Sequence, residues 1–173
     1  MEHWIIYDLA SGEELWRGGG SVGSAAQQQF SEGMGMVMVP AQVVRAPTLD
    51  LDALRAASAV KIDDEAELIR QRILTPGAGQ AMTYQRKEAE ARAWSVDNDT
   101  TTPFLTAEAG ARGMTIADLA AEIIELADAW VAIGAAIEGL RMGAKAAVGR
   151  AGNLGAIVAA GKVDWSILNG TQS

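Results

Sequence analysis

The sequence predicts an α+β protein: a small N-terminal β-hairpin or sheet, followed by an antiparallel α-helical bundle with one long central helix. Short aromatic and β-branched runs separated by glycines fill residues 1–48. Apolar residues then recur at helical spacing, and residues 116–147 carry an unbroken heptad pattern. We therefore expect a β-rich attachment domain over 1–48, a helical bundle domain over 49–165 and a C-terminal tail over 166–173.

The first 48 residues are expected to form a small antiparallel sheet. Trp4–Tyr7 is an apolar run that suits a pleated strand. The turn residues of Asp8–Gly12 lead into a return strand over Glu13–Arg17, so a hairpin is predicted. Met34–Val39 predicts a third strand and Gln42–Arg45 a fourth. A sheet of this size is marginal by itself and needs a partner surface.

Helical spacing begins near Asp50, whose carboxylate suits a helix N-terminus. The segment Thr75–Gly79 is expected to stop the first helix, because its proline and glycines interrupt helices. A threonine–proline pair, Thr102–Pro103, predicts the start of another helix. The further short helices are expected over residues 80–94, 103–112 and 154–160, with 163–165 packing back as a terminal anchor.

The long helix begins after the predicted cap residue Thr115. Its seam residues follow one another at alternating gaps of three and four, as in a coiled coil. Alanines and glycines flank the seam, so neighbouring helices can approach closely. We therefore expect the core of the bundle to consist of Ile116, Leu119, Ile123, Leu126, Trp130, Ile133, Ile137 and Leu140.

Composition excludes several classes of function. Fourteen Lys and Arg against 22 Asp and Glu give a net charge of −8, the wrong sign for a protein that neutralises nucleic-acid phosphates. The chain has no cysteine and one histidine, so a disulfide framework, a thiolate metal site and a multi-histidine metal centre are excluded. No stretch of about 18 apolar residues occurs, and we expect no membrane insertion.

One glycine motif matches a dinucleotide-binding fingerprint, namely Gly18-x-Gly20-x-x-Gly23. That fold also needs a buried parallel strand before the motif and an acidic residue about 20 positions later. The preceding residues are charged, and residues 37–44 contain no acid. A flexible surface loop is therefore the favoured interpretation, and no cofactor is expected.

Clusters of acidic residues have structural interpretations that are favoured over catalytic ones. Asp97, Asp99 and Glu108 echo the spacing of a calcium loop, but Thr102 stands where that loop requires glycine. The acids over 63–67 have helical spacing and are expected to form a solvated face. His3 has no nucleophile or acid in a triad-like context. No enzyme activity is expected.

Three segments of the helical part carry motifs of a known family. The most specific one is Ile73–Ala91, which contains TPGAGQAM followed by Tyr84, Lys87 and Glu90–Ala91. It resembles a segment of small proteins encoded among the tail genes of tailed bacteriophages and prophages. The others are Pro103–Ala109 and the alanine-rich Ala129–Glu138 with its tryptophan; the N-terminal Tyr7–Glu13 resembles the opening of such proteins more weakly. The resemblance covers about residues 50–160.

The resemblance implies a structural virion protein of the distal tail, meaning the tail fibre, tail tip or baseplate. It implies other tail proteins as partners, a homo-oligomer such as a trimer, assembly in the host cytoplasm and a final location in the virion tail. It implies no catalytic residues. Two alternatives stay open: a tail-fibre assembly chaperone, and a small-ligand-binding module that uses the loop over 18–23.

Contacts with a partner are expected from the N-terminal part. Methionines at every second position, from 34 to 38, offer an adaptable apolar strip, because methionine repacks readily. An alternative is that these methionines face the protein's own bundle. The predicted partner-binding residues are Trp4, Tyr7, Trp16, Met34, Met36 and Met38.

Overall fold

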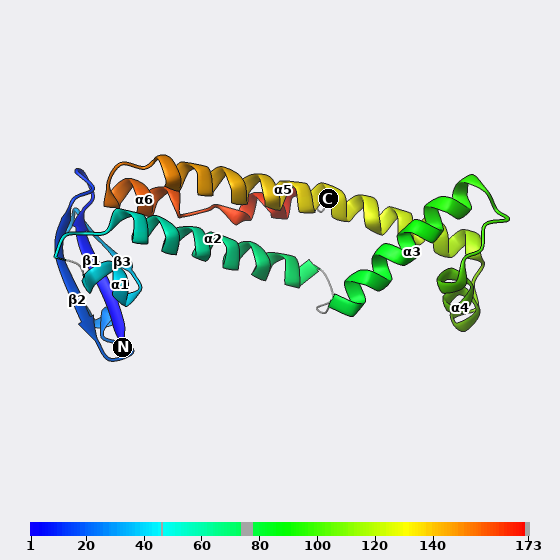
Figure 1. Ribbon diagram of the computed structural model, residues 1–173, viewed down its shortest axis with the longest axis horizontal. Helices are drawn as coiled ribbons and strands as arrows, with labels where there is room; N and C mark the ends of the chain where they lie inside the picture. Colours follow the sequence, from blue (N-terminus) through cyan, green and yellow to red (C-terminus); the bar gives the residue numbers. More distant parts are fainter. Residues whose placement is uncertain (46, 74–77, 172–173) are drawn as a thin grey trace. The chain divides into compact units, whose positions relative to one another are not determined.

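The computed structural model describes residues 1–45, 47–73 and 78–171, and its α+β architecture confirms the predicted fold class (Figure 1). The strands are β1 Glu2–Asp8, β2 Glu14–Gly20 and β3 Met34–Met38. The α-helices are α1 Ala41–Arg45, α2 Leu51–Ile73, α3 Ala78–Val96, α4 Pro103–Arg112, α5 Ile116–Arg150 and α6 Leu154–Ala160. Two short 3-10 helices are η1 Ala25–Gln27 and η2 Trp165–Thr171. The predicted helix stop at Pro76–Gly77 lies outside the described residues.

The sheet is antiparallel with the strand order β2-β1-β3. β1 is the central strand, and its whole apolar run Trp4–Tyr7 is buried. Ile5 and Tyr7 point to one face, towards helices, whereas Trp4 and Ile6 point to the other. A continuous apolar run is therefore required here, because both faces of a central strand are covered.

The predicted fourth strand over 42–45 is wrong, because these residues form α1. Proline has no N–H to donate to a ladder, so Pro40 ends the sheet pairing after β3. The carbonyl of Pro40 then accepts a hydrogen bond from Val43 at 3.0 Å, which closes a helical turn. Val43 is fully buried, and this burial turns the short run into a helix that covers the sheet.

The prediction of a flexible loop over 18–23 is also wrong for residues 18–20, because these three glycines belong to β2. A Cβ at Gly18 would lie 2.3 Å from the indole ring of Trp4. A Cβ at Gly20 would lie 2.6 Å from Ser24 Oγ. Gly18 therefore makes room for the Trp4 ring of the neighbouring strand, and Gly20 makes room for the Ser24 side chain.

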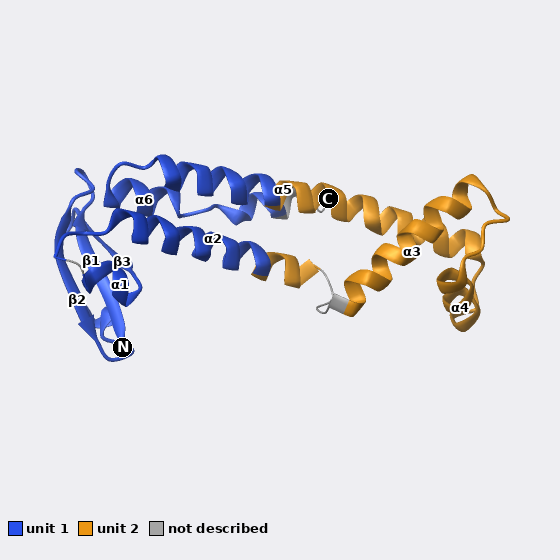
Figure 2. Cartoon of the chain, in the orientation of Figure 1, with its two compact units in different colours: residues 1–67, 138–170 blue, residues 68–137, 171–173 orange. Residues whose placement is uncertain are grey.

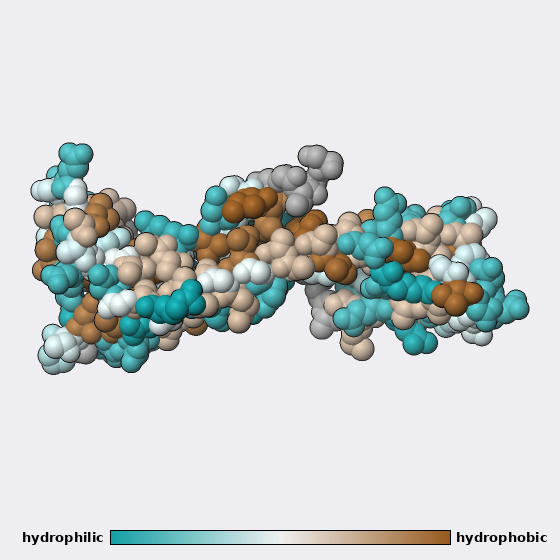
Figure 3. Space-filling model, turned by 90° about the horizontal axis from the view of Figure 1, so that it is seen from above, coloured by the Kyte–Doolittle hydropathy of each residue, from teal (hydrophilic) through white to brown (hydrophobic). Residues whose placement is uncertain are grey.

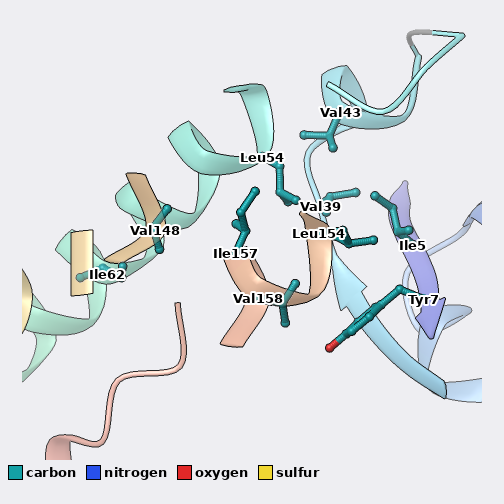
Figure 4. Close-up of a cluster of buried hydrophobic side chains, with 10 residues drawn as sticks. All are labelled: Ile5, Tyr7, Val39, Val43, Leu54, Ile62, Val148, Leu154, Ile157 and Val158. Atoms are coloured by element: carbon teal, nitrogen blue, oxygen red, sulfur yellow. The ribbon is translucent and has the colours of Figure 1, made fainter. Parts of the chain in front are cut away.

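The chain forms two compact units (Figure 2), with residues 1–67 and 138–170 in the first and residues 68–137 and 171–173 in the second. The predicted domain boundary at 48/49 does not coincide with this division. The sheet shares one core with helices that follow it in sequence, so the first unit crosses that boundary. Figure 4 shows this core, which contains Ile5, Tyr7, Val39, Val43, Leu54, Ile62, Val148, Leu154, Ile157 and Val158.

The second unit has its own smaller core, formed by Ala91, Leu105, Ala109, Leu119 and Ala120. Residues of α3, α4 and the first turns of α5 contribute to it. Helix α4 has the predicted bounds. The side chain of Thr102 makes no capping hydrogen bond, and the buried carboxylate of Glu90 in α3 performs that task instead. Its Oε2 accepts hydrogen bonds from the backbone N–H of Phe104 at 2.9 Å and of Leu105 at 3.2 Å.

Candidate interaction surfaces

Most of the predicted partner-binding residues lie on one face of the sheet. Directly opposed residues of antiparallel strands point to the same side. Trp4 is opposite Met38, Ile6 is opposite both Trp16 and Met36, and Asp8 is opposite Met34. The structure thus brings Trp4, Trp16, Met34, Met36 and Met38 together on the face that points away from the helical core.

Two of these predictions fail because the side chains are inaccessible. Tyr7 points to the opposite face and is buried in the core of the first unit, where burial raises the pKa of its phenol. Trp4 is also buried, at 4% exposure, under Ala25 of η1 and beside Met34 and Met36. Both residues stabilise the sheet and are not available to a partner.

The remaining residues, Trp16, Met34, Met36 and Met38, form a surface that we call the outer sheet face. Trp16 is 42% exposed and Met38 is 48% exposed, whereas Met34 and Met36 are half-buried. The methionines therefore do not face the protein's own bundle, the alternative left open by their spacing. An apolar surface of tryptophan and methionine is typical of protein–protein contacts.

The outer sheet face adjoins an open strand edge. Val39 donates its backbone N–H to His3, and Leu9 donates to Gly33, at 2.9 and 2.8 Å. The odd-numbered residues of β3 therefore pair with β1, and the backbone groups of Met36 and Met38 point away from the sheet. In the described part of the chain, no strand lies on this outer side of β3. Such an edge can accept an added strand.

The heptad seam of α5 is covered unevenly. Leu119 and Ile137 are fully buried, and Ile116, Ile123, Trp130, Ile133 and Leu140 are half-buried. Leu126 is 63% exposed, so the prediction that it is a core residue is wrong for the single chain. Figure 3 shows apolar side chains, in brown, at the surface along α5. The apolar spacing extends further along α5 than the part of the seam that is buried within the chain.

Two carboxylates of α2, Asp63 and Glu65, form structural contacts within the first unit. Lys145 Nζ lies 2.6 Å from Asp63 Oδ2, and Arg141 contacts Oδ1 of the same carboxylate. Lys145 first and Arg141 second hold the pKa of Asp63 below its usual range. Glu65 accepts a hydrogen bond from Trp165 Nε1 at 3.0 Å, which fixes the C-terminal anchor onto α2. These carboxylates are used in holding the first unit together.

Asp97, Asp99 and Glu108, whose spacing echoes a calcium loop, belong to two separate structural features. Asp97 Oδ1 accepts the backbone N–H of Asp99 at 3.0 Å, which is a local turn. Glu108 forms ion pairs with Lys87 at 2.6 Å and Arg112 at 3.2 Å, and Lys87 is the main cause of its lowered pKa. Among the described residues, no group of three or more His, Cys, Asp or Glu is placed to hold a metal ion.

An open hollow of about 740 Å³ lies beside α3 and α4, with Met82, Arg86 and Phe104 in its lining. Arg86 is the ionisable residue in that lining, so acid and base groups do not converge there. No helix within the described ranges combines the length and the apolar character needed to cross a membrane.

Comparisons with known proteins do not identify a family. No protein-family model, no curated protein and no solved structure matches this chain. The relation to phage tail proteins therefore stays a prediction, and functional argument depends on the surfaces described above.

Proposed function

We propose that this chain is a structural protein that acts by binding other protein chains, in the distal tail of a bacteriophage. The observation that supports this proposal is the outer sheet face beside the open edge of β3. Exposed Trp16 and Met38 provide apolar contacts, and the outward backbone groups of Met36 and Met38 provide hydrogen bonds. The setting in a phage tail follows from the sequence resemblance.

The partner that suits this surface is an extended segment of another tail protein. A strand added to β3 would pair with the free backbone groups, and alternate side chains of that strand would lie on the outer sheet face. Methionine side chains adapt to different partner residues, so contacts with more than one tail protein are compatible with this surface. Copies of the chain are proposed to assemble as a homo-oligomer.

The proposal is tested by quantitative mass spectrometry of purified virus particles from cells that carry the gene. A structural virion protein is expected at a fixed ratio to the other tail proteins. Absence from finished particles, combined with loss of infectious particles when the gene is deleted, would instead support the assembly chaperone.

A pair of matched variants tests the surface itself. Met38→Asp places a charge on the outer sheet face and is expected to lower incorporation of the chain into particles at least about tenfold. Val60→Asp introduces the same charge on α2 at a position that is 58% exposed, and it is expected to leave incorporation unchanged. Equal incorporation of both variants would contradict a role for the outer sheet face.

The alternative of a nucleotide-type ligand at residues 18–23 is tested by thermal shift with nucleotides and divalent metal ions. Gly18 lies next to the Trp4 ring and Gly20 lies next to the Ser24 side chain, so the protein's own side chains fill the space beside both glycines. We expect no change in melting temperature. A shift that disappears in Gly20→Ala would support ligand binding.

A further inference from the structure

The middle of α5 carries apolar side chains that the described chain covers only in part. Residues 129–137 contain no charged side chain. A helix segment that is apolar on all sides is normally buried. Here Leu126 is 63% exposed and Val131 is 60% exposed. We call Ile123, Leu126, Trp130 and Ile133 the α5 window, because these seam residues lie between the fully buried Leu119 and Ile137.

We infer that the α5 window binds the same window of a second copy of this chain, with the two helices antiparallel about a two-fold axis near residue 128. A seam with alternating gaps of three and four maps onto itself when one helix is reversed. Leu126 of each copy then lies opposite Trp130 of the other, and Ile123 lies opposite Ile133. The two central layers each combine a leucine with a tryptophan, and the two outer layers each combine two isoleucines.

The distribution of charge along α5 favours this partner and this direction. Asp118, Glu122, Glu125 and Asp128 precede residue 129, and no lysine or arginine occurs between Gly113 and Leu140. Parallel copies would place these acidic segments side by side, which is unfavourable. Antiparallel copies place each acidic segment along the uncharged residues 129–137 of the other copy. Asp118, Glu122 and Glu125 of one copy then lie away from the same acids of the other, and the uncharged segment is covered. The two Asp128 residues lie near the axis, and each is paired with Arg92 of its own chain at 2.6 Å.

The residues that flank the window allow the two helices to approach closely. Ala127, Ala129, Gly134 and Ala136 are small. A Cβ at Gly134 would lie 3.4 Å from the Trp130 ring, so the ring lies over this glycine, along the helix. Because Leu119 and Ile137 are already buried within one chain, the contact between copies is limited to the window. We therefore expect a dimer that dissociates on dilution, and this inference does not depend on the location of the chain in a virion.

The oligomeric state is measured by sedimentation equilibrium of the full chain over a range of concentrations. The wild-type chain is expected to reach twice the mass of one chain. Leu126→Glu is expected to weaken the dimer at least about 100-fold, because it places two carboxylates in a closed apolar contact. Val131→Glu is the matched control, since Val131 is exposed to the same degree but lies outside the seam. We expect it to leave the dimer intact, and circular dichroism checks that both variants keep their helices.

A chain that stays monomeric at every concentration would overturn the inference. A trimer would overturn it too, as would equal weakening by the two glutamate variants, because either result would mean that another geometry covers the apolar segment.

The direction of pairing is tested by disulfide formation, which the absence of native cysteine makes specific. Ile123→Cys and Ile133→Cys proteins are oxidised separately and as a mixture. Antiparallel pairing predicts disulfide-linked dimers in the mixture and none in either protein alone. Parallel pairing would link each protein to itself, and that result would contradict the proposed dimer.

Discussion

The two ends of α5 and its middle have the same heptad spacing but different surroundings. At the N-terminal end, Leu119 packs with residues of α3 and α4, and at the C-terminal end Ala144 packs against the core of the sheet unit. Between them, Leu126 is largely exposed. The difference teaches that a heptad seam identifies the apolar face of a helix without identifying the chain that covers it.

The largest expected effect is a difference in the free energy of unfolding between alanine variants of two leucines in the same seam. Leu119→Ala removes a fully buried side chain and is expected to lower the free energy of unfolding by about 2–5 kcal/mol. Leu126→Ala is expected to lower it by less than about 1 kcal/mol, because the side chain already contacts water in the single chain. Urea unfolding at a dilution where the copies are separate measures both. Similar losses in the two variants would show that the middle is covered within the chain.

A second effect concerns the carboxylate that holds α4 against α3. Glu90→Ala leaves the N–H groups of Phe104 and Leu105 without their acceptor, and we expect a loss of about 1–3 kcal/mol in unfolding free energy. Glu90→Gln keeps an acceptor oxygen and should lose less. Glu88→Ala is the control, because its ion pair with Arg92 is partly exposed and should contribute under about 1 kcal/mol. A loss in Glu90→Ala no greater than in this control would exclude the capping role.

The covered ends were easier to predict than the uncovered middle, for physical reasons. Local signals placed α4 and α6 at their observed bounds, because prolines and glycines act through neighbouring residues, although the cap expected from Thr102 is supplied by the distant Glu90. Burial along α5 depends on elements far away in the sequence, so Leu119 and Leu126 have the same local pattern and different exposure.

The sheet teaches the same lesson. The period-two methionines predicted a common face, but spacing alone did not tell which face the helices cover. Residues 42–45 have strand-like composition, and burial of Val43 against the sheet made them a helix. The glycines of β2 suggested a loop, because the side chains that require them, Trp4 beside Gly18 and Ser24 beside Gly20, come from outside β2. The open edge of β3 could not be predicted from side chains, since it consists of backbone groups.

The smallest expected effect is the pH dependence of the contact between α2 and the C-terminal half of α5. Ion pairing lowers the pKa of Asp63 in the folded chain, so its carboxylate stabilises the fold above the ordinary value of 3.8, and this contribution is lost as the pH falls through the lowered pKa. Asp63→Asn is expected to be less stable than wild type at neutral pH, with the difference closing in acid. Melting temperatures measured from pH 7 to pH 2 test this.

Asp64→Asn is the control for that series, because Asp64 is exposed on the same helix turn. A difference between Asp63→Asn and wild type that stays constant down to pH 2 would mean that the ion pairs do not explain the effect.

The most direct test of the central claim compares thiol reactivity at Leu119→Cys and Leu126→Cys as the protein is concentrated. If the ends of α5 are covered within one chain and its middle by a second copy, the thiol at position 119 is protected at every concentration. The thiol at position 126 should react rapidly in dilute solution and become protected as dimers form. Protection at position 126 that is independent of concentration would contradict the account, as would rapid reaction at every concentration.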